Sequence, residues 1–382
     1  PTEPVMLDKP IDIGQLPTPA LVLDRATMSN NIRAMSEHLG SHGKGFRPHA
    51  KTHKCPEIAR QQMAAGAVGI CTAKVSEAAV MVRAGIDRVL VTSPVSTAAK
   101  ARVINHMLTP DITLLLVVDS SAGLAALAGE IDDDKRVGIV LDLDVSMGRT
   151  GLREDTLFLR LLDQIEADRR FYFAGVQHYA GHIMHIPEFE KRREKSLRSW
   201  QRLANKFELL AARGVTPDIV TGGGTGTYDI DTTIEQLTDI QVGSYIFMDE
   251  EYRQVQGAGS DRFQGFELAL TVACTAISQP QAATITVDGG YKAFASDSVN
   301  PVCDALPDVQ FRFAGDEHGV LILPLAEGVG QNEAPPVQLG QVLEFAVPHC
   351  DPTVNLHDQY WIREADGMVH SIWPISARGC SW

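Results

Sequence analysis

Short apolar runs alternate with amphipathic stretches along the first two thirds of the chain. Met28, Ile32, Met35 and Leu39 fall on one face of a predicted helix. Helical stretches also separate the apolar runs, among them 56–66, which has Pro56 in its first turn and glycine at its end, and the long charged segment 188–214. The apolar runs, eight in number, cover residues 46–51, 67–73, 88–93, 112–118, 136–144, 171–179, 218–222 and 239–247.

Strand-like runs that are apolar throughout are typical of a parallel sheet with helices on its faces. Eight such strand–helix units predict an α/β fold built on a TIM-like (β/α)8 barrel, and we place this barrel at residues 25–260. A doubly wound sheet is the alternative that the pattern leaves open.

The pattern changes from about residue 266 to short strand-like pieces separated by Gly, Pro and Asp, without a strong helix. We therefore predict an all-β domain at residues 261–382. Residues 18–24 read as a strand opened by proline, and we expect the N-terminal segment 1–24 to associate with this β domain.

Composition and charge narrow the classes of function. The formal net charge of −14 argues against nucleic-acid binding, which requires a basic face. The first residues do not form a secretory signal, and the longest apolar run, 112–118, is too short to cross a bilayer. The six cysteines form no Cys-x-x-Cys pair. We expect a cytoplasmic protein with free thiols.

One lysine stands out at the end of the first barrel strand, in the sequence FRPHAKTHKC. Lys51 is surrounded in sequence by Arg47, His49, His53 and Lys54. Cationic neighbours or burial keep a lysine amine partly deprotonated, and such an amine forms an imine with an aldehyde. Lys51 is therefore a candidate for covalent attachment of a cofactor, and a solvated basic loop is the alternative.

Further polar residues follow other predicted strands. Functional groups of a parallel barrel collect at the C-terminal ends of its strands. The loop after 136–144 contains Arg149, and the strand 171–179 ends in a segment with several polar groups. The candidates in that segment are Gln177, His178, Tyr179, His182 and His185.

Two glycine-containing strand ends predict a phosphate site. The run 221–227 reads TGGGTGT, and its backbone N–H groups and threonine hydroxyls can approach a phosphate closely. The next strand ends in GSY, and the last two barrel loops often form such a site. A tight loop without a ligand is the alternative. The candidate residues are Thr221, Gly223, Gly224, Thr225, Gly243, Ser244 and Tyr245.

A candidate metal pair lies far downstream in VPHCDPTVNLHD. If this stretch is extended, His349 and Asp351 face the same side and Cys350 faces the other. Imidazole and carboxylate without thiolate suit Mn2+, Mg2+ or Zn2+, and two protein ligands leave positions for water and substrate. A turn opened by Asp351 and Pro352 is the alternative.

Together these motifs resemble the D-threonine aldolase and D-serine dehydratase family of pyridoxal-phosphate enzymes, which has the alanine racemase fold. The resemblance covers nearly the whole chain, through TPALVLD, RPHAK, TGGGTGT, GSY, DEHG, HCDPTVNLHD and ISARG. It implies that Lys51 is the Schiff-base lysine and that the glycine-rich and GSY segments hold the cofactor phosphate. It also implies that Tyr179 lies by the pyridine ring, Arg149 near the cofactor and His185 beside the substrate hydroxyl.

The same resemblance implies a reaction and an assembly. The dehydratase branch typically has His-x-Cys, whereas His349 and Asp351 match the His-x-Asp of the aldolase branch. We therefore expect metal-dependent retro-aldol cleavage of D-3-hydroxy amino acids, D-threonine giving glycine and acetaldehyde, with Mn2+ as the first choice of metal. Dehydration of D-serine or 3-hydroxyaspartate, and a non-catalytic pyridoxal-phosphate-binding protein, are the alternatives. Because the fold relatives are dimers, a homodimer is expected.

Overall fold

The computed structural model describes residues 3–144, 147–324 and 337–382. Two compact units interleave along the chain. The β unit comprises 1–31, 244–254 and 262–378, and the barrel unit comprises 32–243, 255–261 and 379–382. The sequence prediction instead divides the chain at residues 24 and 260.

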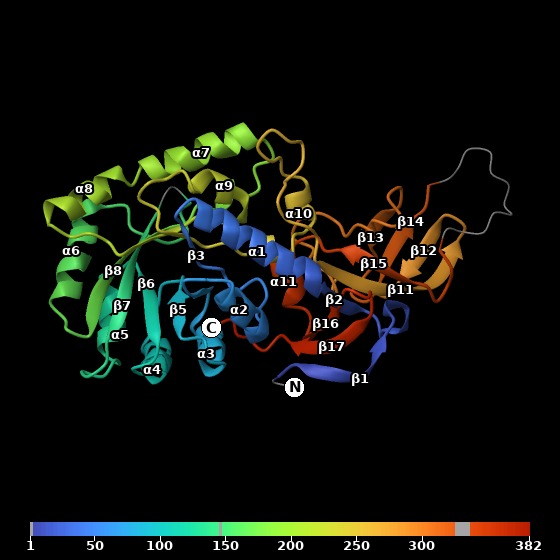
Figure 1. Ribbon diagram of the computed structural model, residues 1–382, viewed down its shortest axis with the longest axis horizontal. Helices are drawn as coiled ribbons and strands as arrows, with labels where there is room; N and C mark the ends of the chain where they lie inside the picture. The colour runs from blue at the N-terminus through green and yellow to red at the C-terminus, as the bar shows by residue number, and fades with distance from the viewer. Residues whose placement is uncertain (1–2, 145–146, 325–336) are drawn as a thin grey trace. The chain divides into compact units, whose positions relative to one another are not determined.

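The barrel unit is built on a parallel sheet, part of which is seen with its covering helices in Figure 1. Its eight described strands run in the order β3-β10-β9-β8-β7-β6-β5-β4. A parallel bridge between His49 and Cys71 joins the chain after β3 to β4, so the strands close on themselves. The (β/α)8 prediction is confirmed, and the doubly wound alternative is wrong. The strands are β3 (Gly45–Phe46), β4 (Ile70–Thr72), β5 (Arg88–Val91), β6 (Thr113–Val118), β7 (Val137–Leu143), β8 (Phe171–His178), β9 (Ile219–Gly222) and β10 (Asp239–Ile240).

The helices of the barrel unit follow their strands as the sequence predicts. Pro56 occupies the first turn of α2, where no backbone donor is needed, and the Ser120 hydroxyl caps α5 by accepting from the Gly123 N–H. The predicted helix 188–214 is instead two helices, interrupted at Arg202 and Leu203. The helices are α2 (Pro56–Ala64), α3 (Val75–Arg83), α4 (Ala98–Met107), α5 (Ser121–Ala128), α6 (Asp155–Glu166), α7 (Phe189–Gln201), α8 (Ala204–Ala212) and α9 (Tyr228–Asp231), with 3-10 turns η2 (Gly181–Ile183) and η3 (Thr225–Thr227).

Helix α1 (Arg25–Ser41) begins directly after β2 (Ala20–Asp24). Its predicted apolar face is buried, with Met28, Met35 and Leu39 at 0% exposure. The barrel interior contains a separate apolar cluster that includes Leu90, Val117 and Val140. The pattern of apolar and polar positions predicts that these residues are buried, and the structure agrees.

The β unit is organised around β11. This strand pairs antiparallel with β2, which also pairs with β16, so the predicted association of residues 18–24 with the β domain is confirmed. The strands β1, β13, β16 and β17 were not predicted from the sequence. The elements are β1 (Val5–Ile11), β2, β11 (Leu270–Gln281), β12 (Thr284–Val287), β13 (Gln310–Phe313), β14 (Gly319–Ile322), β15 (Val342–Ala346), β16 (Gln359–Arg363) and β17 (Val369–Pro374), with η1 (Ile13–Gln15), η4 (Ser244–Ile246), α10 (Glu250–Arg253) and α11 (Cys350–Val354).

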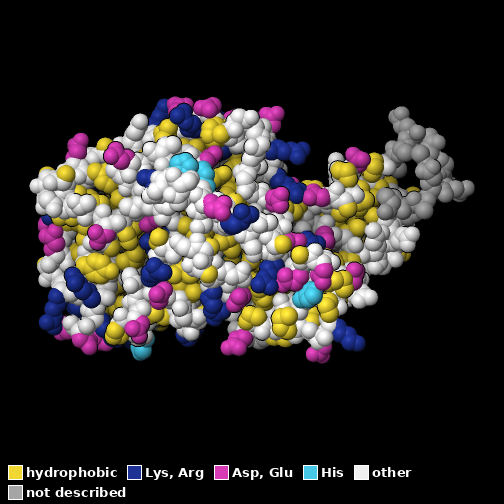
Figure 2. Space-filling model, viewed as in Figure 1, with side chains coloured by type: hydrophobic (Ala, Val, Ile, Leu, Met, Phe, Trp, Pro, Cys, Tyr) yellow, Lys and Arg dark blue, Asp and Glu magenta, His cyan; other side chains and the backbone are white. Residues whose placement is uncertain are grey.

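On the face drawn in Figure 2, Lys and Arg side chains are interspersed with Asp and Glu. Among the helices that the structure describes, none is long and apolar enough to cross a membrane.

Candidate active site

Lys51 lies in the turn after the first barrel strand. The prediction that this strand runs from 46 to 51 is wrong, because β3 ends at Phe46 and only an isolated bridge between His49 and Cys71 continues the pairing. The residue before Lys51, Ala50, donates its N–H to the Cys71 carbonyl at 2.7 Å, which ties the segment to β4. The Lys51 N–H donates to Nδ1 of His49 at 3.3 Å, and Nε2 of His49 lies 3.1 Å from the Thr92 hydroxyl. Since Nδ1 accepts, the ring proton is on Nε2. The Lys51 side chain is half-buried, whereas His49 is buried.

The other cations of this segment are paired with carboxylates. Arg47 Nε lies 2.9 Å from Asp239 Oδ1, and Lys54 Nζ donates to Glu77, with all four side chains buried. The charges of Arg47 and Lys54 are therefore balanced locally. Their carboxylate partners come from β10 and α3, and the sequence analysis did not identify this pairing.

Two predicted cofactor residues, Gln177 and Thr221, belong to a buried hydrogen-bond network in the barrel. Gln177 Nε2 donates to Asp142 Oδ1 at 2.9 Å, and Gln241 Nε2 donates to both Gln177 Oε1 and Thr221 Oγ1 at 3.1 Å. Thr221 Oγ1 in turn donates to Asp239. Burial raises the pKa of Asp142 above its usual value, against the opposing hydrogen bond from Gln177. The network fixes both side chains, and a contact with the cofactor stays a prediction.

Arg149 and Tyr179 lie together in the loops after β7 and β8. The Arg149 guanidinium carbon is 5.3 Å from the centre of the Tyr179 ring, which is a cation–π arrangement. The loop that carries Arg149 is shaped by Asp144, whose Oδ1 accepts from the N–H groups of Met147 and Gly148 at 2.9 and 3.1 Å. The fold therefore brings Arg149 and Tyr179 together, and the contact of each with the cofactor stays a prediction.

The glycine-rich segment forms a cradle of backbone donors after β9. Within the described residues, the N–H groups of Gly223, Gly224 and Gly226 donate to no other group. A Cβ at Gly226 would lie 2.1 Å from the Met184 carbonyl oxygen, and Gly223 has φ +64°, which favours glycine. Backbone donors without side-chain obstruction fit a phosphate group.

A buried polar cluster next to this cradle was missed by the sequence analysis. Asp231 accepts hydrogen bonds from the hydroxyls of Thr227 and Ser196 and from Trp200 Nε1, and Trp200 stacks on His178 with 4.1 Å between ring centres. Burial raises the pKa of Asp231 to about 6 and lowers the pKa of His178 to about 4. The i, i+4 spacing of Thr227 and Asp231 was the available sequence signal.

The GSY segment follows β10 rather than forming part of it. The strand ends at Ile240, so the prediction that it extends to 247 is wrong; Gly243 precedes η4, which begins at Ser244. A Cβ at Gly243 would lie 2.6 Å from the Thr52 hydroxyl. The N–H groups of Gly243 and Ser244 donate to no described group, which suits an anion, while Tyr245 is fully buried.

His182 and His185 lie in the loop after β8, and both side chains are exposed. His182 belongs to η2, and His185 follows it. The fold thus presents two imidazoles on one barrel loop, and the choice between them as a base stays a prediction.

His349 and Asp351 lie at the start of α11, in the β unit. The condition under which both residues were expected to face one side, an extended stretch, is not met: His349 is extended and precedes the helix, and Cys350–Val354 is helical. Burial alone would lower the pKa of His349, but the charge of Asp351, the hydrogen bond to Asp297 and the charges of Asp249 and Glu251 outweigh it and raise this pKa. The effect of Asp351 is consistent with the two side chains lying close to each other.

This nitrogen and oxygen donor set suits Mn2+, Mg2+ or Zn2+. Within the residues described here, no group of three or more His, Cys, Asp or Glu side chains could hold a metal ion. The pair His349 and Asp351 would therefore leave coordination positions for water and substrate.

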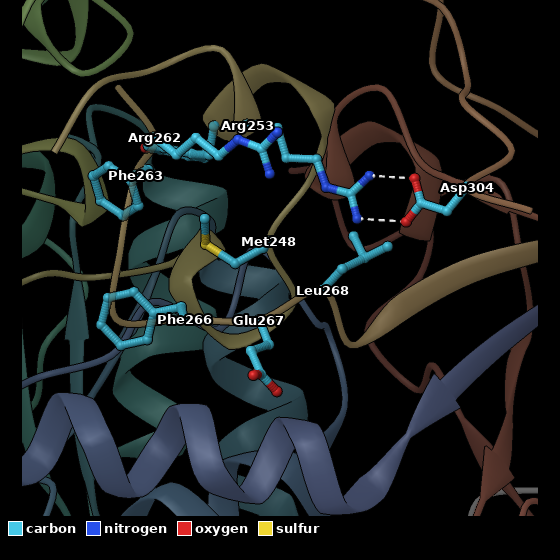
Figure 3. A pocket seen from close by; sticks show the side chains of 9 residues that line it. Met248, Arg253, Arg262, Phe263, Phe266, Glu267, Leu268 and Asp304 are labelled. Carbon is cyan, nitrogen blue, oxygen red and sulfur yellow. Dashed lines mark hydrogen bonds and ion pairs between the residues drawn. The ribbon is translucent and has the colours of Figure 1, made fainter. Parts of the chain in front are cut away.

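A separate cavity of about 660 Å³ lies in the β unit and contains none of the predicted site residues. Arg253 lines it and forms two hydrogen bonds of 2.7 Å with the carboxylate of Asp304 (Figure 3). Phe263, Phe266 and Met248 line another part of the cavity. The sequence analysis did not single out this cavity.

Comparison with known proteins connects these features to a family. Residues 23–251 match the family described as "Alanine racemase, N-terminal domain", and residues 269–363 match "Putative serine dehydratase domain". A D-threonine aldolase from Arthrobacter sp. is 36% identical over 97% of this chain and 94% of its own length. A 3-hydroxy-D-aspartate aldolase from Paracoccus denitrificans is 32% identical over the same shares of the two chains, 97% and 94%.

The structures agree with these matches. The crystal structure of a D-threonine aldolase from Filomicrobium marinum superposes with a TM-score of 0.90 at 31% identity, covering 99% of this chain and 100% of that one. A D-threo-3-hydroxyaspartate dehydratase from Delftia sp. is more distant, at 26% identity over 93% of this chain and 96% of its own length.

Proposed function

The chain belongs to the D-threonine aldolase family of the alanine racemase fold, and from that membership we propose that it cleaves D-3-hydroxy amino acids by a retro-aldol reaction. It is a pyridoxal-phosphate-dependent lyase. The observation that supports the reaction type is the similarity to two aldolases over 97% of the chain. Their sequence identities of 36% and 32% exceed the 26% identity to the dehydratase. We propose D-threonine as its substrate, with glycine and acetaldehyde as products.

The barrel unit offers the residues that would hold pyridoxal phosphate. Lys51 Nζ would hold the aldehyde carbon, and the N–H groups of Gly223, Gly224 and Gly243 would donate to the phosphate. Thr225 is a further candidate in the barrel unit, and Ser244 and Tyr245, which follow Gly243 directly in the chain, are candidates as well. When bound, the cofactor's pyridinium ring accepts the electrons released as the substrate's Cα–Cβ bond breaks.

Arg149 and Tyr179 would flank the cofactor. Their cation–π contact holds the guanidinium against the tyrosine ring. Gln177 and Thr221 would support the site indirectly, because their hydrogen bonds with Gln241 join the neighbouring strand ends of β8 and β9.

His349 and Asp351 would hold a divalent ion, which when bound lowers the pKa of the substrate's β-hydroxyl. Mn2+ is our first choice, with Mg2+ and Zn2+ as alternatives. We assign His185 as the base that removes the hydroxyl proton, since an imidazole titrates near neutral pH. His182 is its competitor because the same loop carries both. The protein is proposed to work as a homodimer in the cytoplasm.

A second reaction uses the same groups. In dehydration of a 3-hydroxy amino acid, Lys51 removes the α-proton and the β-hydroxyl leaves, which gives a 2-oxo acid and ammonia. The 26% identity to the Delftia dehydratase supports this candidate. The carboxylate at 351 favours the aldolase, because the dehydratase branch typically has cysteine at that position.

An assay with the two enantiomers of threonine tests the proposal. Glycine should form from D-threonine in the presence of Mn2+, and a chelator should abolish its formation until metal is restored. L-threonine serves as the matched control and should give no glycine. Cleavage of L-threonine, or full activity after metal removal, would contradict the proposal.

A further inference from the structure

The imidazole of His349 has a carboxylate partner outside the predicted metal pair. Its Nδ1 lies 2.9 Å from Asp297 Oδ2, which is hydrogen-bonding distance, and 3.9 Å from Glu251 Oε2. Asp297 lies 52 residues before His349 in the chain, so no sequence motif connects them.

Backbone contacts hold both residues in place. The Thr353 hydroxyl donates to the His349 carbonyl at 2.8 Å and accepts from the Ala295 N–H at 3.0 Å. The start of α11 is thereby tied to the segment that leads to Asp297. On the other side, the Asp249 carboxylate accepts from the Cys350 N–H at 2.9 Å. The contact between His349 and Asp297 therefore joins two anchored segments.

An acceptor on Nδ1 determines which nitrogen of His349 is available to a metal ion. Asp297 accepts from Nδ1–H, so the neutral ring carries its lone pair on Nε2. A carboxylate in this position fixes the tautomer and orientation of a metal-binding histidine and increases its basicity. We propose that Asp297 is a positioning residue for the divalent ion, holding His349 so that Nε2 binds it. This inference rests on the metal pair of the proposed function.

Asp297 is better suited to orient His349 than to bind the ion itself. Its side chain is 54% exposed, and its Oδ2 is already engaged by the ring. Within the described residues it forms no three-membered metal-binding group with His349 and Asp351. Removing Asp297 should therefore weaken metal binding without abolishing it.

Metal affinity in the absence of substrate tests this role. Binding of Mn2+ to the cofactor-loaded protein can be followed by the electron paramagnetic resonance signal of free Mn2+. Asp297→Asn and Asp297→Ala should each raise the Kd for Mn2+ by about 10- to 100-fold, the usual effect of losing such a partner. At saturating Mn2+, both variants should recover near wild-type kcat, which a misfolded protein would not.

A second Asp–His contact in the same unit provides a matched control. Asp366 Oδ2 lies 2.8 Å from His370 Nε2, and this histidine belongs to no proposed metal site. Asp366→Asn should leave the Kd unchanged. The unfolding midpoints of the metal-free Asp297 variants should match the wild type.

Three outcomes overturn the inference. An unchanged Kd in both Asp297 variants excludes a positioning role. Complete loss of binding, as expected for His349→Ala, would make Asp297 a metal ligand. If His349→Ala and Asp351→Ala bind Mn2+ normally, the metal pair itself is wrong, and the proposed function fails along with the inference.

Discussion

Nδ1 of His49 accepts the backbone hydrogen bond of Lys51, the residue assigned to hold the cofactor. The opposite nitrogen of the same ring lies 3.1 Å from the Thr92 hydroxyl, which donates to the Thr72 carbonyl. His49 thus connects the Lys51 backbone to strands β4 and β5, and the position of the lysine depends on a side chain two residues away.

The role of His49 can be tested by substitution. In His49→Ala the Lys51 N–H loses its acceptor, and the protein should lose about 1 kcal/mol of unfolding free energy and bind pyridoxal phosphate more weakly. His49→Asn places an amide oxygen near the position of Nδ1 and should lose less. Urea unfolding and an absorbance titration with the cofactor measure these effects. If His49→Ala had the same unfolding free energy and the same affinity for the cofactor as the wild type, His49 would not position Lys51.

The glycine cradle predicts a difference between two neighbouring substitutions. Gly226→Ala directs its Cβ at the Met184 carbonyl, which cannot move without the backbone, and should cost about 1–3 kcal/mol. Gly224→Ala meets the Met184 sulfur at 2.9 Å, the far part of a flexible side chain, and should cost less. The free energy of unfolding and the cofactor Kd measure both. A larger loss of unfolding free energy in Gly224→Ala than in Gly226→Ala would contradict this geometry.

Burial of His178 predicts a pH-dependent stability. Its folded pKa of about 4 lies below the ordinary value of 6.5, so the unfolded chain binds the proton first as the pH falls. Above pH 6.5 the neutral His178 does not lower the free energy of unfolding. As the pH falls from 6.5 to 4, protonation of the unfolded chain lowers this free energy by about 3 kcal/mol.

His178→Phe keeps the stacking surface against Trp200 and removes the titrating ring. The difference in unfolding free energy between variant and wild type, measured by urea titration at several pH values, should therefore grow in favour of Phe as the pH falls below 6.5. A difference that does not change with pH would contradict a lowered pKa.

The sequence predicted the barrel strands well because each is a short apolar run whose burial on both faces leaves a clear pattern. It predicted β3 and β10 too long, and at β10 the reason is that Val242, Tyr245, Ile246 and Phe247 are buried without being in a strand. It failed at residues 350–354, which form a helix where alternation in an extended chain was assumed. Pro352 is compatible with the first turn of a helix, so the local sequence allowed either conformation.

Partners distant in the chain could not be predicted. Arg47 is paired with Asp239, 192 residues away, and only the closure of the barrel brings them together. The same holds for the Asp231 carboxylate, which receives Ser196 and Trp200 from α7. The sequence identified candidate residues by their type and by their position at strand ends. Their hydrogen-bond and ion-pair partners could be identified only from the folded structure.

The attachment residue itself is open to direct labelling. Reduction of the cofactor-loaded protein with borohydride should fix the cofactor on Lys51, as identified by peptide mass spectrometry. Lys54 is the matched control because it lies three residues away but is buried against Glu77. A label on Lys54, or on another lysine, would overturn the assignment.

The products formed from D-threonine test the central claim most directly. With Mn2+ and pyridoxal phosphate present, glycine and acetaldehyde should appear in equal amounts, and 2-oxobutyrate and ammonia should be absent. Accumulation of 2-oxobutyrate with ammonia in place of glycine would contradict the aldolase assignment and identify the protein as a dehydratase.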